Sequence, residues 1–111
     1  MTQKEALALA ASVRAHAVPE ELLIRFLSEL EGRVRREIRG EKAPSAPSPV
    51  THNNKKLSAP APYDRLYWSY LVAMIDLTAG DTEAYTTSYA LFHEAWSAYA
   101  RAWQSTGGRC G

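Results

Sequence analysis

Residues 85–103 read YTTSYALFHEAWSAYARAW, and the spacing of the large side chains in this stretch predicts one long α-helix. Six aromatic residues follow each other at intervals of four, three, four, three and four: Tyr85, Tyr89, Phe92, Trp96, Tyr99 and Trp103. At 3.6 residues per turn these intervals place all six on one side of the helix, which we call the aromatic stripe. An apolar side of this length has to be covered by other parts of the chain or by another protein.

A second row runs one residue behind the aromatic stripe and consists mostly of small side chains: Ala84, Ser88, Leu91, Ala95, Ala98 and Ala102. We call it the small-residue row. The remaining sector of the helix is polar and typical of a solvated side. Because the two rows together cover more than half of the helix circumference, we expect the preceding helix to cover one of them but hardly both.

Three interpretations of the aromatic stripe remain open at this point. It forms the core of a four-helix domain, it meets another copy of the chain or a different protein, or it is a stacking platform for sugars or bases. Tyr and Trp are enriched at the centres of protein interfaces, where they bury much area and keep a polar tip. Stacking of nucleic-acid bases is disfavoured by the lack of a basic surround.

Three further helices are predicted before the aromatic one. Thr2 followed by Glu5 has the form of a capping box, so a first helix is expected from Gln3 to His16. Pro19 suits the first turn of a second helix, expected from Glu20 to Arg39. Its apolar residues repeat at threes and fours and give it one apolar side: Leu23, Phe26, Leu27, Leu30, Val34 and Ile38.

The third helix is expected to open at Pro62-Tyr63-Asp64 and to run to Thr78. The short turn Ala79-Gly80-Asp81 follows, and Asp81 is expected to cap the fourth helix, which runs to Gln104. Such a short turn makes the two helices antiparallel neighbours. The sequence therefore predicts an all-α fold, a small helical bundle with an antiparallel helical hairpin at its C-terminal end.

The organisation along the chain follows from the change in composition after the second helix. Prolines recur among Ser, Ala, Lys and Asn between residues 41 and 62, and this stretch has too few apolar residues to fold alone. It is either a passive linker or an extended arm that orders against another subunit. We expect one domain: helices at 1–40, the proline-rich insertion at 41–62, the hairpin at 63–104 and a flexible tail at 105–111.

Composition argues against catalysis and against a membrane protein. The formal net charge is +1, the single cysteine is Cys110, and the three histidines, His16, His52 and His93, stand on different segments. No metal-ligand spacing, glycine-rich phosphate loop or nucleophile motif is present. No apolar run approaches the roughly 20 residues that span a bilayer. We expect no enzyme and no cofactor or metal, and a soluble protein made in the cytoplasm.

Two polar features have a structural and a functional interpretation. Asp76 interrupts an apolar helix. We favour a role in ion pairing or hydrogen bonding at an interface over a role as a general acid. Arg35, Arg36 and Arg39 form the best candidate for nucleic-acid contact. The alternative for these arginines is favourable interaction with the C-terminal end of a helix dipole.

A series of different short motifs lies in the C-terminal half: Pro62-Tyr63-Asp64-Arg65-Leu66-Tyr67, Tyr70-Leu71, Ala73-Met74-Ile75-Asp76-Leu77, Gly80-Asp81, Tyr85-Thr86-Thr87-Ser88, Leu91-Phe92 and Tyr99-Ala100-Arg101. They resemble small phage virion proteins encoded in head-assembly gene clusters, of the head-tail connector (adaptor) kind. The chain departs from that pattern at Thr86-Thr87 and at His93, where the family has asparagines. The segment from Phe26 to Gly32 looks like the family's leucine-rich N-terminal helix.

The resemblance implies a helical subunit that forms a ring, commonly twelve-fold, between the portal and the tail of a virion assembled in the host cytoplasm. Its partners would be copies of itself and the portal and tail proteins, with packaged DNA passing through the lumen, and it would use no cofactor. The rival functions are a small regulatory or adaptor module that grips a partner helix in the small-residue row, and a nucleic-acid-binding protein. We expect the subunit or partner interface to include Tyr85, Tyr89, Trp96, Tyr99, Trp103, Ala95, Ala98, Ala102, Trp68 and Asp76.

Overall fold

The computed structural model describes residues 1–40 and 56–105. Within these residues the chain forms α1 (Gln3–Val13), α2 (Glu20–Arg33), the short π-helix η1 (Val34–Ile38), α3 (Arg65–Thr78) and α4 (Thr82–Ser105). The all-α prediction is confirmed for this part of the chain. The proline-rich stretch up to residue 55, the tail from residue 106 and Cys110 lie outside the described residues.

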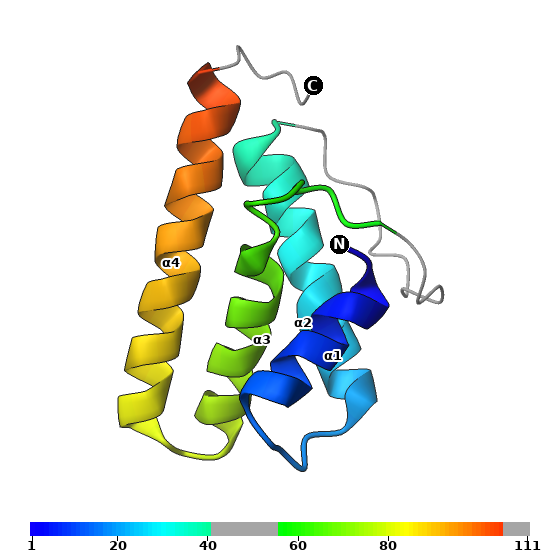
Figure 1. Cartoon of the computed structure of the whole chain (residues 1–111), viewed down its shortest axis with the longest axis vertical. Coiled ribbons are helices and arrows are strands. Elements are labelled where there is room, and N and C mark those ends of the chain that lie inside the picture. Colours follow the sequence, from blue (N-terminus) through cyan, green and yellow to red (C-terminus); the bar gives the residue numbers. More distant parts are fainter. Residues whose placement is uncertain (41–55, 106–111) are drawn as a thin grey trace.

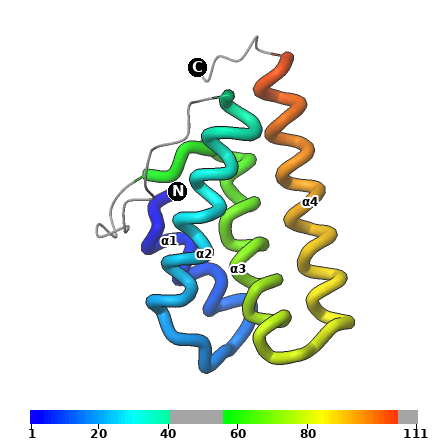
Figure 2. The backbone as a smooth tube through the Cα atoms, turned by 180° about the vertical axis from the view of Figure 1, so that it is seen from behind, coloured from blue at the N-terminus to red at the C-terminus, as the bar shows by residue number. Residues whose placement is uncertain are grey.

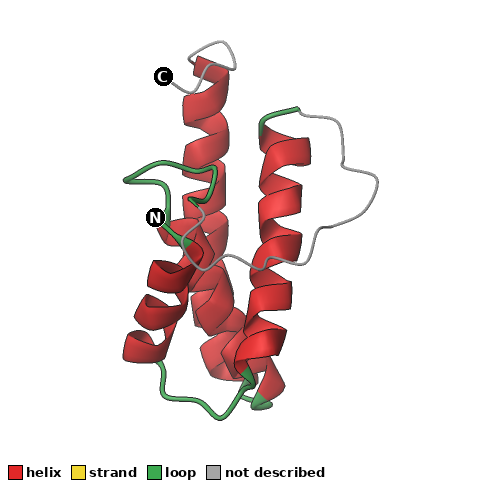
Figure 3. Ribbon diagram, turned by 90° about the vertical axis from the view of Figure 1, so that its right-hand side faces the viewer, coloured by secondary structure: helices red, strands yellow, loops and turns green. Residues whose placement is uncertain are grey.

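The helices run alternately down and up, with α3 in the middle of the bundle (Figures 1 and 2). α1 and α2 pack against one side of α3 and α4 against the other (Figure 1). Figure 3, coloured by secondary structure, shows the described residues as helices joined by loops. By backbone proximity α4 packs on α3 and η1, whereas α2 reaches it through side chains, such as Arg33 over the Trp96 ring. As a result α3 is buried around almost its whole circumference, whereas α4 has one covered side.

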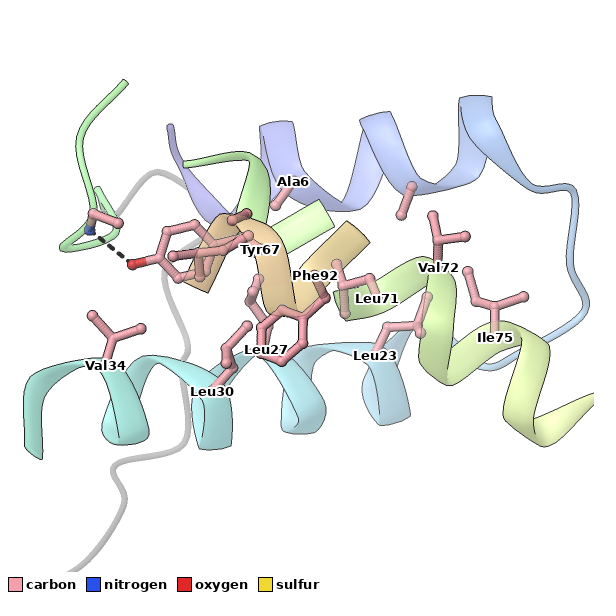
Figure 4. Close-up of a cluster of buried hydrophobic side chains, with 14 of the residues drawn as sticks. Ala6, Leu23, Leu27, Leu30, Val34, Tyr67, Leu71, Val72, Ile75 and Phe92 are labelled. Carbon is pink, nitrogen blue, oxygen red and sulfur yellow. Dashed lines mark hydrogen bonds between the residues drawn. The ribbon is translucent and has the colours of Figure 1, made fainter. Parts of the chain in front are cut away.

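The core lies between α2 and α3, and Ala6 and Ala10 of α1 and Phe92, Ala95 and Tyr99 of α4 complete it. The apolar residues of α2 and η1 point toward α3 in a single row: Leu23, Leu27, Leu30 and Val34 (Figure 4). Tyr67 and Leu71 of α3 and Phe92 of α4 meet this row (Figure 4). Intervals of four, three and four in the row keep it on one side of the helix, as the sequence predicts.

The predicted capping box at the start of α1 is confirmed, but the helix ends three residues earlier than predicted. The backbone N–H of Thr2 donates to Glu5 Oε1 at 2.8 Å, and this hydrogen bond lowers the pKa of the Glu5 carboxyl. α1 stops at Val13 instead of His16 because Arg14 is extended, at φ −138° and ψ 113°. From this position the Arg14 side chain reaches Asp76 on α3.

The second helix also differs from the prediction of one continuous α-helix up to Arg39. Its last turn is π-helical, and the backbone N–H of Arg39 donates to the carbonyl of Val34, five residues back, at 3.1 Å. The wider turn carries Arg39 over the Trp103 ring of α4, at 5.0 Å from the ring centroid. Gly40 then ends the element with φ 68°, in the left-handed region that glycine enters without strain.

Asp81 caps α4 as predicted, since its Oδ1 accepts the backbone N–H of Ala84 at 3.0 Å. The turn before it is closed by Gly80, with φ 75°. This turn sends α4 back antiparallel alongside α3, and α4, with 24 residues against 14 in α3, extends beyond it at its C-terminal end (Figure 1).

A buried polar network fixes residues 57–60, the described end of the proline-rich stretch, to the bundle. Tyr67 Oη donates to Glu31 Oε1 at 2.7 Å. It also accepts the backbone N–H of Ala59 at 2.8 Å, the hydrogen bond drawn in Figure 4. Glu31 Oε2 accepts both the backbone N–H and the hydroxyl of Ser58, each at 2.8 Å. Burial, together with the nearby Glu31 carboxylate, raises the pKa of Tyr67 far above its ordinary value of 10.0. This short segment therefore packs against its own chain.

We expect Tyr67→Phe to lower the free energy of unfolding by about 1–3 kcal/mol at pH 7, because the buried N–H of Ala59 loses its acceptor. The pKa of Tyr67 is higher in the folded chain than in the unfolded chain. Above about pH 10 only the unfolded wild-type chain therefore ionises this residue, which destabilises the wild type and not the variant. The difference between the two proteins should shrink there. Urea unfolding followed by circular dichroism at neutral and alkaline pH measures it.

Tyr85→Phe is the matched control, because Tyr85 is only partly buried near the start of α4. It should change the unfolding free energy by no more than about 0.5 kcal/mol. A stability difference between Tyr67→Phe and the wild type that stays constant as the pH rises would contradict the assigned network.

Candidate interaction surface

α3 lies over the boundary between the aromatic stripe and the small-residue row. Four residues of α4 are buried. Phe92 and Tyr99 belong to the aromatic stripe, and Ser88 and Ala95 belong to the small-residue row. The expectation that α3 covers one row but hardly both is therefore wrong. The small side chains let α3 come close, and the neighbouring rings reach around its flank.

The other aromatic residues of α4 are covered from one edge by residues of α2, η1 and α3. The Arg33 guanidinium lies 5.0 Å from the centroid of the Trp96 ring, and Arg39 stacks on Trp103 in the same way. The Phe92 ring lies 4.9 Å from Tyr70 of α3 between ring centroids. The stripe thus forms a core that continues as half-buried rings along the side of α4 facing η1.

The predicted interface residues divide into two groups. Tyr99, Ala95 and Asp76 are buried inside the chain and are no part of its exposed surface. The others of α3 and α4 are half-buried: Tyr85, Tyr89, Trp96, Trp103, Ala98, Ala102 and Trp68. Only this second group can contribute to a contact made by the folded chain.

The candidate nucleic-acid residues do not form one open patch. Arg39 stacks on Trp103 and Arg35 is half-buried, so Arg36 is the only one of the three that is exposed. Arg33, one turn earlier, pairs with Glu37 at 3.2 Å. The arginines at this end of the helix mostly cover tryptophan rings or pair with acidic neighbours.

Among residues 1–40 and 56–105, the most exposed large apolar side chain is Leu91, which belongs to the small-residue row and is 54% exposed. Trp68 of α3 lies beside it across a shallow depression of about 100 Å³, whose other walls are Arg65, Ser69 and Glu94. We call this depression with its rim the Leu91 surface. α1 exposes a second apolar pair one turn apart, Leu9 and Val13.

Asp76 is buried and paired within the chain. Its Oδ1 receives Arg14 Nε at 2.8 Å, and its Oδ2 accepts hydrogen bonds from the Ser88 hydroxyl at 2.7 Å and from Arg14 Nη2 at 3.3 Å. The carboxylate thus joins α3 to α4 and to the residue that follows α1. Since both oxygens are occupied, Asp76 holds helices together and is poorly placed for proton transfer.

A cavity of about 440 Å³ opens beside this ion pair, between the α1–α2 connection and the C-terminal end of α3. We call it the end pocket. Its apolar walls are Ala15, Ala17, Val18, Pro19, Leu22, Ile75 and Ala79. Arg14, His16, Asp76, Thr78 and Asp81 supply its polar groups. His16 is oriented by the backbone N–H of Val18, which donates to its Nδ1 at 3.1 Å.

The described residues hold neither a group of metal-ligating side chains nor a membrane-spanning helix. Between residues 1–40 and 56–105, no three His, Cys, Asp or Glu side chains are grouped so that they could hold a metal ion. None of the helices in the described part of the chain is both long and apolar enough to cross a membrane. What the described surface offers is an apolar pocket and exposed apolar side chains.

Comparisons with models of protein families, with curated proteins and with solved structures found no match. The site is therefore defined by its geometry alone. The sequence did not predict two parts of the site, the end pocket and Arg14. Arg14 follows an alanine-rich helix and has no visible partner nearby, and its partner Asp76 stands 62 residues away.

Proposed function

We propose that this chain is a structural virion subunit, a head-tail connector (adaptor) that assembles into a ring between portal and tail. The observation that carries the proposal is the pairing of an apolar pocket with exposed apolar residues elsewhere on the same small chain. Leu91 and the end pocket lie on different elements, α4 and the α1–α2 connection. A subunit with two different, separate contact surfaces can bind the next copy head to tail.

The finer features of the proposal come from the resemblance to phage connectors. The antiparallel hairpin of residues 63–104 would form the body of the subunit, and the insertion at 41–62 would be an arm that reaches portal or tail proteins. Packaged DNA would pass through the ring without specific contacts. The subunit would be assembled in the host cytoplasm and would use no catalytic residue and no cofactor.

Native mass spectrometry of the purified chain, over a range from micromolar to millimolar concentration, tests assembly. We expect closed rings of one size, with the population growing as concentration rises or when the portal protein of the proposed virion is added. A chain that stays monomeric over this whole range, both alone and with that portal protein, would contradict the proposal.

One observation favours a second candidate, a small adaptor module. Ala98 and Ala102 are half-buried and follow Leu91 along the small-residue row, so this side of α4 offers a shallow surface for a partner helix. A stable monomer that binds one foreign helical peptide, and loses it on Leu91→Asp, would support this candidate over the connector. The third candidate, nucleic-acid binding, has only Arg36 exposed among its three residues. A steep fall of DNA affinity with salt would be its signature.

A further inference from the structure

Four half-buried aromatic side chains have hydrogen-bond donors that the chain does not use. They are Tyr70 of α3 and Tyr85, Tyr89 and Trp96 of α4, and we call them the ring surface. The Tyr85 and Tyr89 rings lie 5.6 Å apart between centroids, and the buried Phe92 ring contacts Tyr70, Tyr89 and Trp96. Within the described residues, the three hydroxyls and the Trp96 indole N–H form no hydrogen bond. Half-buried rings with a free polar tip are typical of protein interfaces.

The sequence of the proline-rich stretch contains a segment with matching chemistry. Residues 44–51 read PSAPSPVT and repeat at intervals of three, with one apolar row and one polar row: Pro44, Pro47 and Val50, then Ser45, Ser48 and Thr51. A polyproline II helix has three residues per turn, so each row lies on one side of such a helix. Its carbonyls have no internal hydrogen-bond partner, and segments of this kind bind surfaces lined by aromatic rings.

The lengths of the two partners agree. From Tyr85 to Trp96, α4 rises about 17 Å at roughly 1.5 Å per residue. From Pro44 to Val50, a polyproline II helix rises about 19 Å at roughly 3.1 Å per residue. The apolar row is therefore long enough to lie along the rings of Tyr85, Tyr89 and Trp96 together.

We propose that the row formed by Pro44, Pro47 and Val50 of one copy binds the ring surface of a neighbouring copy. The tyrosine hydroxyls and the Trp96 indole N–H donate to carbonyls of the bound segment. This inference rests on the proposed function and gives the arm a binding site on the next subunit. Because the segment and the ring surface are different parts of the chain, the contact is head to tail and continues from copy to copy until a ring closes.

The partner is a second copy because the ring surface of the same chain is out of reach. After Val50, six residues lead to Lys56, which is at most about 20 Å of extended chain. Lys56 pairs with Thr2 at the start of α1. α1 and α4 lie on opposite sides of α3, so two helix-to-helix distances of about 8–10 Å separate them. α4 also begins below the start of α1 (Figure 1), and a path around α3 is longer still.

Mixing two defective chains tests the contact. One chain carries Pro44→Ala, Pro47→Ala and Val50→Ser, and the other carries Tyr85→Ser and Tyr89→Ser. Each alone should stay monomeric by native mass spectrometry where the wild type assembles. Their mixture should give a heterodimer, because one intact segment and one intact ring surface remain. A chain with Ser45→Ala and Ser48→Ala, on the polar row, is the matched control and should assemble like the wild type.

A gentler variant gives a second readout that does not depend on removing half-buried rings. A synthetic peptide of residues 41–53 is titrated into the chain with the altered segment, and the NMR signal of the Trp96 indole N–H is followed. Adding Tyr89→Phe keeps the ring and should leave the melting unchanged, but should weaken peptide binding roughly three- to tenfold, because one hydrogen bond is lost. Trp68→Phe, at a half-buried ring outside the ring surface, is the matched control and should leave peptide binding unchanged.

The outcomes separate this inference from the proposed function. Rings that form from the chain with the altered segment would overturn the contact and leave the connector proposal standing. A Trp96 signal that does not move at saturating peptide concentration would overturn the contact as well. So would a wild-type monomer whose Trp96 signal differs from that of the altered-segment chain at every concentration, since its segment would then bind its own chain. A chain that never assembles, with or without the portal protein, would overturn both.

Discussion

Replacing Phe92 by alanine should lower the free energy of unfolding by about 3–5 kcal/mol. The Phe92 side chain is almost fully buried, and its ring contacts Tyr70 of α3 and Tyr89 and Trp96 of α4. Removing it leaves a cavity where α4 meets α3, the helix against which most of α4 packs. For a domain of this size each kcal/mol corresponds to roughly 4–8 °C in Tm, so the loss is visible by calorimetry.

Two further variants make the result specific to that position. Leu91 directly precedes Phe92 but lies on the exposed side of the helix. Leu91→Ala should therefore lower the free energy of unfolding by no more than about 0.5 kcal/mol. Trp96→Ala should cost less than Phe92→Ala, because Trp96 is half-buried under Arg33 and does not lie at the centre of the core. If the loss at Trp96 exceeded that at Phe92, the buried centre of the stripe would have to move toward the η1 end of α4.

Arg14→Ala should destabilise the chain by about 2–4 kcal/mol. It leaves the buried Asp76 carboxylate with Ser88 as its remaining hydrogen-bond donor, and an unpaired buried charge is costly. The loss falls toward the lower end of the range for a broken buried pair because Arg14 is nearly half exposed and water can take part of its place. Thermal and urea unfolding of the variant measure the effect.

A double-mutant cycle identifies the charge as the cause. Asp76→Asn keeps the shape and an acceptor for Ser88 but removes the negative charge, so Arg14→Ala should cost much less in that background. Arg25→Ala, at an exposed arginine of α2, is the matched control and should be nearly neutral. Losses at Arg14 and Asp76 that simply add would show that the pair does not act as a unit.

The fold was largely predictable because each helix carries its own periodic signal and its own end signal. Thr2 with Glu5, Gly40 and Asp81 mark helix ends through local hydrogen bonds or backbone angles, and such effects can be read from neighbouring residues. The early end of α1 could not be predicted in this way. The extended Arg14 that follows it pairs with a residue on another helix, and neighbouring residues do not reveal such a contact.

The candidate surface was less predictable, for a similar reason. Periodicity shows that Phe92 and Leu91 point in different directions, but it does not tell which direction α3 covers. α3 covers the boundary between the two rows, which buries Tyr99 and leaves Leu91 in solvent. The end pocket is built from a connection and the end of a distant helix, and no repeat in the sequence marks either.

The central position of α3 has a consequence for how this chain can change over evolutionary time. Its 14 residues are packed against neighbours in three directions, so nearly every substitution there has to satisfy more than one contact. The polar side of α4 and the outer side of α1 carry no such demand and are free to diverge. A distant relative should therefore be recognised by the pattern of its third helix, even where the rest of its sequence has drifted beyond comparison.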